Sequence, residues 1–277
     1  MDILFTAFFL SVVLVGIHSF FGMEILKRGI IFTDLAIGQM AALGAAVSLF
    51  FLEGEFLYPI SLLFAFFGAF VIAIASKAEK LSEAFIGLIY AFGIATVFLI
   101  LSKSPQGTED FQRLLANDLL FVSLRDIYQT TGIYFLIGIA LYLTEKFFKN
   151  HLKDISFFLL FAITVTSSVK LAGVLVVFSL LVAPALVSLI MASRSNLLFA
   201  WIYGTLVNLL GVFISYKFDL PTGYTLVSLH SMVAAFIFLL KGRGRIIHKP
   251  GDLPGSPHNI VFEDKTGEGA QKLFPER

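Results

Sequence analysis

The chain has 277 residues, of which 58% are hydrophobic and only 14% are charged, and its mean hydropathy is +0.90. Soluble domains are nearer half apolar and a quarter charged, so a water-soluble globule of this size could not bury so much apolar surface. A net charge of +1 gives no field for binding nucleic acid, and the lack of cysteine excludes disulfides, thiol catalysis and cysteine-ligated metal.

Apolar runs long enough to cross a lipid bilayer recur from residue 3 to residue 241. A membrane-spanning helix needs about 20 apolar residues, and runs that are continuous rather than alternating favour helices over a β-barrel. The sixth and seventh runs are separated only by the polar stretch Ser167–Lys170 and by Gly173. We therefore predict an all-α membrane bundle of eight or nine helices, at about 3–22, 29–52, 56–76, 84–102, 127–145, 155–171, 173–192, 197–216 and 223–241.

Most of the 20 lysines and arginines fall on one side of the bundle, which predicts an outside N-terminus and an inside C-terminus.

Two segments outside the apolar runs have distinct compositions. Residues 242–277 are rich in charge, glycine and proline, so we expect a disordered cytoplasmic tail after a permease domain at 1–241. In the longest outer segment, 104–126, the amphipathic stretch Leu114–Val122 predicts a short surface helix.

Few polar residues interrupt the apolar runs. There is no GxxxxGK[ST] loop for ATP and no HExxH motif, and Asp34 is the acid that lies well inside a run. An ionisable group there should face a cavity or a partner. Gln39 follows about 7 Å further along the helix, and His18 lies near the middle of the preceding run. These oxygen and nitrogen donors suit a divalent cation.

The same residues also allow a purely structural interpretation. Asp34 could pair with a nearby basic residue or join a hydrogen-bond cluster between helices, and His18, Gln39 and His230 could simply be packed in the core. Gly44 and the small residues on either side of it, Gly38, Ala41, Ala42, Ala45 and Ala46, would let a neighbouring helix approach closely. Pro184 frees a backbone carbonyl four residues earlier, which marks either a gate or ordinary packing.

Four stretches, in this order and spacing, resemble the zinc/manganese/iron permease family of ABC importers. One is a basic inner turn, one is the polar helix TDLAIGQMAALG, one resembles the family's Val-Gly-Val-Leu-Leu-Val…Ile-Pro-Ala stretch, and one resembles its Leu-Pro-Ser-Gly turn. They lie at Gly22–Arg28, at 33–44, at Lys170–Val177 continuing to Leu181–Ala185, and at Asp219–Gly223.

This resemblance implies a multi-pass permease of the cell (inner) membrane, with a divalent metal ion as transported substrate and no covalently bound cofactor. It implies a homodimer with the metal path between two copies, a separate ATP-binding subunit on the cytoplasmic face, and an extracytoplasmic metal-binding protein. The path residues of the family are an Asp and a His in the polar helix. Asp34 matches the Asp, and Gln39 stands where the His would be. Gly44, Pro184 and Gly223 fall in stretches that match the family.

The sequence departs from the family in two places. Glutamine in place of histidine weakens a zinc site more than a site for a harder ion, and five residues turn a helix by about 500°, so Asp34 and Gln39 point about 140° apart. The family's long inner segment, which docks the ATPase through a coupling helix, is reduced here to Lys146–Asp154. Its candidate contacts with the ATPase are Lys146, Lys149 and Lys153.

The leading hypothesis is the membrane subunit of an importer for manganese, iron or zinc, with ATP hydrolysis carried out by a separate subunit. The shortened inner link motivates an alternative, an uncoupled relative that acts as a membrane assembly or interaction protein. An intramembrane enzyme is the third possibility. It would need paired acids, a Ser–His pair or HExxH within the bilayer, and one embedded Asp does not supply a pair.

Overall fold

The computed structural model describes residues 2–76, 81–117, 119, 122–148, 151–191 and 197–241. These residues form an all-helical bundle, which confirms the predicted fold class. Nine of the helices in the described ranges are long and apolar enough to cross a membrane, and α5 is the short one. The helices are α1 (Asp2–Arg28), α2 (Thr33–Phe51), α3 (Leu57–Ala75), α4 (Ser82–Leu101), α5 (Gly107–Leu115), α6 (Leu124–Phe147), α7 (His151–Ala172), α8 (Val174–Met191), α9 (Leu197–Phe218) and α10 (Thr222–Lys241).

The sixth and seventh spans are separate helices, and a single residue divides them. Gly173 has a φ of +86°, and a side chain there would place its Cβ 2.7 Å from the backbone of Ala116. Helix α7 runs unbroken through Ser167 and Ser168, whose hydroxyls donate to the carbonyl of Thr164 within the same helix. The break therefore depends on the glycine, because serine hydroxyls bonded within a turn leave the helix intact.

Helix α1 is longer than the sequence suggests. The stretch Gly22–Arg28, expected as a basic inner turn, forms the last two turns of α1, and the turn to α2 lies at Gly29–Phe32. The reason is packing: Gly22 lies so close to α8 that a side chain there would overlap the carbonyl oxygen of Leu181. The absence of a side chain lets α1 continue straight past α8, and the two helices make extensive contacts.

The short outer helix also differs from the prediction. It spans α5, seven residues earlier than the expected start at Leu114, and residues 118, 120 and 121 of the expected stretch lie outside the described residues. Glu109 and Arg113 lie one turn apart on α5, and their ion pair of 2.6 Å stabilises this helix. Ala116 is then extended, so that the amide of Asn117 donates to the carbonyl of Ala172 at 2.9 Å.

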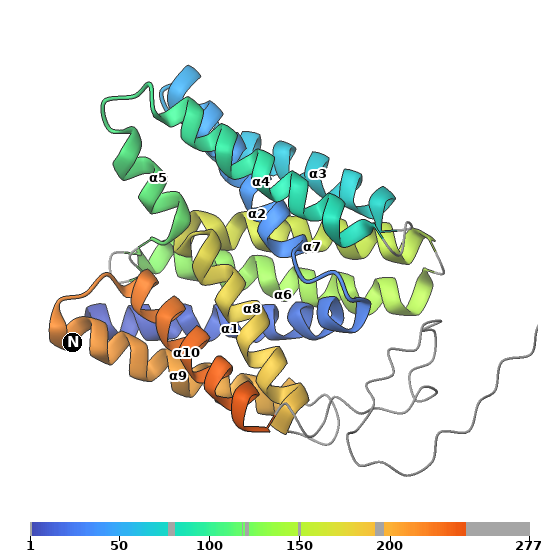
Figure 1. Cartoon of the computed structure of the whole chain (residues 1–277), viewed down its shortest axis with the longest axis vertical. Helices are drawn as coiled ribbons and strands as arrows, with labels where there is room; N and C mark the ends of the chain where they lie inside the picture. Colours follow the sequence, from blue (N-terminus) through green and yellow to red (C-terminus); the bar gives the residue numbers. More distant parts are fainter. Residues whose placement is uncertain are drawn as a thin grey trace, which may run out of the picture.

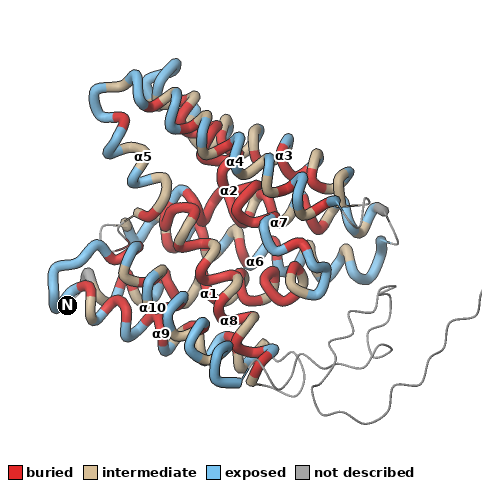
Figure 2. Tube along the Cα trace, viewed as in Figure 1, coloured by how far each residue is buried: buried red, intermediate tan, exposed pale blue. Residues whose placement is uncertain are grey.

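Helix α2 lies at the centre of the bundle (Figure 1). Of the residues in the 18-residue apolar stretch of α2, 78% are buried, because α3, α4, α7 and α8 surround this helix. On the other side α1, α8, α9 and α10 pack together, and Figure 2 shows buried positions along the middle and exposed ones along the outer helix faces. Those outer faces carry large apolar side chains such as Phe67, Leu88 and Phe135, as expected for contact with lipid.

The last described helix, α10, ends at Lys241, and the boundary of the permease domain at residue 241 stays a prediction. The predicted disordered tail, residues 242–277, lies outside the described residues, as do Lys77, Lys80 and Lys149. The direction in which the chain crosses the membrane stays a prediction from the distribution of lysine and arginine.

Candidate functional site

Asp34 is the second residue of α2 and lies in its first turn, nearer the helix end than the apolar run suggests. It is only 1% exposed, and neither carboxylate oxygen has a hydrogen-bond partner among the described residues. The neighbouring hydroxyl of Thr33 is equally buried and, in the same part of the chain, equally without a partner. The N-terminus of a helix favours a negative charge, but a buried acid without a partner is costly. The position is therefore suited to receive a cation.

Gln39 is buried on a different side of α2. Its side chain starts against α4, where a Cβ on Gly93 would come within 2.8 Å of the Gln39 Cβ. Its Nε2 is buried and unpartnered among the described residues. Asp34 lies one turn before Gly38, and Gly38 contacts Val174 at the start of α8. Because residues four apart share a helix face, Asp34 lies on the side of α2 that faces α7 and α8.

His18 belongs to a separate polar cluster between α1, α6 and α7. Its Nδ1 donates to the carbonyl of Leu14 at 2.7 Å, and its Nε2 lies 3.1 Å from the hydroxyl of Ser168. That hydroxyl also bonds to the hydroxyl of Tyr134. Both ring nitrogens are therefore occupied by protein atoms, an arrangement that favours packing over metal binding. In the part of the chain that the structure describes, no three His, Asp or Glu side chains are grouped to hold a metal ion.

Glu83, in the first turn of α4, was missed by the sequence analysis. Its Oε1 accepts a hydrogen bond of 3.1 Å from the amide of Phe32, at the entrance to α2, and its buried Oε2 has no partner among the described residues. A second acid therefore adjoins the helix end that holds Asp34. In the sequence, Glu83 is an acid directly before the fourth apolar run. That position is equally typical of an acid that only stabilises the N-terminus of a helix.

The three residues predicted for gating or packing all lie where helices approach closely. A Cβ on Gly44 would be 2.7 Å from the backbone of α3, and one on Gly223 would overlap the carbonyl oxygen of Asn117. Pro184 is buried inside α8, and its ring lies 3.2 Å from a Cβ built on Gly204 of α9. These contacts explain packing at each position, and a gating role stays a prediction.

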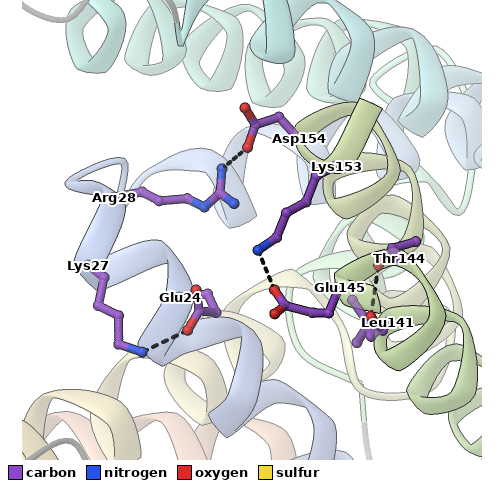
Figure 3. Close-up of polar contacts among 8 residues, drawn as sticks. All are labelled: Glu24, Lys27, Arg28, Leu141, Thr144, Glu145, Lys153 and Asp154. Atoms are coloured by element: carbon purple, nitrogen blue, oxygen red, sulfur yellow. Dashed lines mark hydrogen bonds and ion pairs between the residues drawn. The ribbon is translucent and has the colours of Figure 1, made fainter. Parts of the chain in front are cut away.

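The link predicted to contact an ATPase is tied to its own bundle by ion pairs (Figure 3). Lys153 lies 2.6 Å from Glu145 of α6, and Asp154 lies 2.8 Å from Arg28 of α1. Lys146 is exposed at the end of α6, whereas Lys149 lies outside the described residues. The N-terminal end of α7 is therefore connected electrostatically to both α1 and α6.

Known proteins resemble this chain over most of its length. The sequence profile of the ABC 3 transport family matches residues 1–154 and 147–241. A probable iron transport system membrane protein of Haemophilus influenzae is 26% identical over 263 residues, which cover 86% of this chain and 90% of that protein. The manganese transport system membrane protein MntB of Synechocystis is 27% identical over 171 residues, 56% of each chain. PsaBC from Streptococcus pneumoniae, solved in complex with Fab, shares the fold with a TM-score of 0.70 at 19% identity, covering 89% of this chain and 94% of that chain.

Proposed function

The chain belongs to the ABC 3 transport family, and from this membership we propose that it is the permease subunit of an ABC importer for a divalent metal ion. It is a multi-pass membrane protein, with nine apolar helices of spanning length in the described ranges. The observation that carries the proposal is Asp34, a buried acid in the central helix whose carboxylate has no partner in the described structure. A family of transporters and a buried carboxyl group without a partner among the described residues together favour a cation as cargo.

Asp34 would attract the ion and replace part of its water shell with carboxylate oxygens. Oxygen ligands suit manganese and iron, and the glutamine at position 39 weakens the case for zinc. The names of the relatives above, an iron system and a manganese system, agree with this preference. We propose that two copies form the path, that a separate subunit hydrolyses ATP, and that an external protein delivers the ion.

Uptake of radiolabelled Mn²⁺ and Fe²⁺ tests the role of Asp34. We expect Asp34→Asn, which keeps the shape and removes the charge, to abolish uptake while the protein still reaches the membrane in normal amount. Asp219→Asn is the matched control, because it makes the same change at an exposed turn with a φ of +52° that asparagine tolerates. Full uptake by the Asp34→Asn variant would remove Asp34 from the proposed path.

The uncoupled alternative is also motivated by the structure, because Lys153 and Asp154 of the short link are already paired within the chain. A pull-down of the tagged chain from native membranes in mild detergent separates the two functions. We expect an ATPase subunit to co-purify in near-equal amount. If the folded chain repeatedly purifies without one, and cells lacking it accumulate metal normally, the assembly or interaction role takes its place.

A further inference from the structure

A long groove runs between α1 and α6, with a volume of about 770 Å³. Its walls are mainly apolar, and its floor includes Tyr134 and Phe157. Gly16 of α1 and Gly138 of α6 widen it, since a Cβ at either position would meet no heavy atom within 4 Å. We call this feature the α1–α6 groove. Both of its walls are helices of membrane-spanning length.

The length of the α1–α6 groove matches one leaflet of a bilayer. Its lining residues extend from Val13 to Arg28 on α1 and from Thr131 to Glu145 on α6. At 1.5 Å per residue these stretches are about 22 Å and about 21 Å long. Half of a bilayer, headgroups included, is about 20–22 Å thick. An occupant of the groove would therefore pass from the headgroup level to the middle of the membrane.

The polar end of the groove has equal numbers of acids and bases. Glu24, Arg28, Glu145 and Lys153 line it, and Figure 3 shows them around a common space where α1, α6 and α7 meet. Their side chains are between 29% and 65% exposed. Their pairs with one another and with Lys27 and Asp154 are therefore partly solvated and can exchange partners at small cost. This end offers two donors for an anion and two acceptors for a cation.

An occupant of the α1–α6 groove must combine an apolar body with a polar head, because the walls are mainly apolar and one end is lined by charged side chains. A phospholipid has both parts. The mixed polar end also favours an occupant with a polar head, because the ion pairs of its four ionisable side chains are only partly solvated and can exchange partners.

We propose that the α1–α6 groove binds a zwitterionic phospholipid with a primary ammonium, of the phosphatidylethanolamine class. Its acyl chain lies along the apolar wall, its phosphate accepts hydrogen bonds from Arg28 and Lys153, and its ammonium donates to Glu24 and Glu145. A choline headgroup has no N–H to donate to the two carboxylates. A phosphatidylglycerol headgroup would bring an anion without a cation, so the two carboxylates would oppose it.

The test is native mass spectrometry of the full chain in nanodiscs that contain phosphatidylethanolamine, phosphatidylcholine and phosphatidylglycerol in equal amounts. We expect retained phosphatidylethanolamine to exceed each of the other two by about tenfold, the change that one charge-assisted hydrogen bond supplies. The double variant Glu24→Gln with Glu145→Gln should lose the preference over phosphatidylcholine. Equal retention of all three lipids by the unmodified chain, or a preference for phosphatidylglycerol, would overturn the proposal.

A steric variant tests the groove without touching its charges. Gly138→Phe fills the open space, and we expect it to lose the retained lipid. Gly132→Phe is its matched control, because Gly132 also has open space around its Cβ position but does not line the groove. Equal lipid retention by these two variants would place the lipid elsewhere and contradict the proposal.

A cysteine variant tests occupation of the groove by a second copy. The chain has no cysteine, so Gly138→Cys carries the sole thiol. We expect this variant to stay monomeric on gels after mild oxidation of native membranes, since lipid fills the space. Efficient formation of a disulfide-linked dimer would show a second copy at this position and would overturn the lipid assignment.

Discussion

The cluster around His18 offers a direct measure of what holds α1 to α7. Replacing Ser168 by alanine removes the hydroxyl that lies 3.1 Å from the Nε2 of His18 and that also bonds to Tyr134. His18 keeps its bond to Leu14, and Tyr134 keeps only a longer contact of 3.5 Å with Ser167. Hydrogen bonds between membrane helices contribute about 0.6 kcal/mol on average and up to about 1.7 kcal/mol. A buried polar atom left without a partner costs about 1–3 kcal/mol. We therefore expect Ser168→Ala to lower the free energy of unfolding by about 2 kcal/mol.

The assay is unfolding of the purified chain by a denaturing detergent in mixed micelles, followed by tryptophan fluorescence. The chain has one tryptophan, Trp201, and its indole N–H donates to the carbonyl of Gly16 at 2.8 Å, so the signal reports directly on contact between α9 and α1. Ser167→Ala is the matched control, because Ser167 makes its closer bond within its own helix. A loss for Ser168→Ala no greater than the loss for Ser167→Ala would refute the reasoning.

Three further outcomes are expected in the same unfolding assay. Gly173→Ala should lower the free energy of unfolding by about 3 kcal/mol or more, because a left-handed backbone costs about 1–2 kcal/mol and the new Cβ would also press on a neighbouring backbone. The exposed Gly132→Ala, which meets open space, should change it by less than about 1 kcal/mol in the opposite direction, and equal losses would contradict this explanation. Asp34→Asn should leave stability unchanged or raise it, since it removes a buried charge that lacks a partner, and a large loss would point to a structural ion pair. Arg28→Gln should cost about 1 kcal/mol or less, because its pair with Asp154 is partly exposed, and a loss above about 3 kcal/mol would show that the pair is desolvated in the membrane.

The apolar runs of the sequence were sufficient for the fold class and for a range of eight or nine spans, and nine helices of spanning length lie among the described residues. Continuous apolar runs of about 20 residues leave a chain in lipid only the helix, because each backbone N–H and C=O must then be satisfied within its own segment. The weakest division, between the sixth and seventh runs, is also correct, for a local reason. Gly173 breaks the helix through a backbone conformation that other residues adopt at a cost.

Local errors occurred where contacts between distant segments decide the outcome. The residues Gly22–Arg28 read as a turn, but α8 lies against Gly22 and the helix continues. The short outer helix ends at Leu115 and does not span Leu114–Val122, because Ala116 must extend for the next residue to reach the carbonyl of Ala172. In both cases the partner segment is far away in the sequence, so local pattern carries no signal of it.

For the candidate site, the sequence by itself determined which side chains are chemically unusual, and Asp34 stands out because acids are rare in apolar runs. The tertiary structure decided what each of them meets. It surrounds His18 with Leu14 and Ser168, leaves the carboxylate of Asp34 without a partner among the described residues, and places Glu83 at the start of α2. Residue type follows from the chain alone, whereas hydrogen-bond partners, burial and the α1–α6 groove depend on how separate helices are brought together.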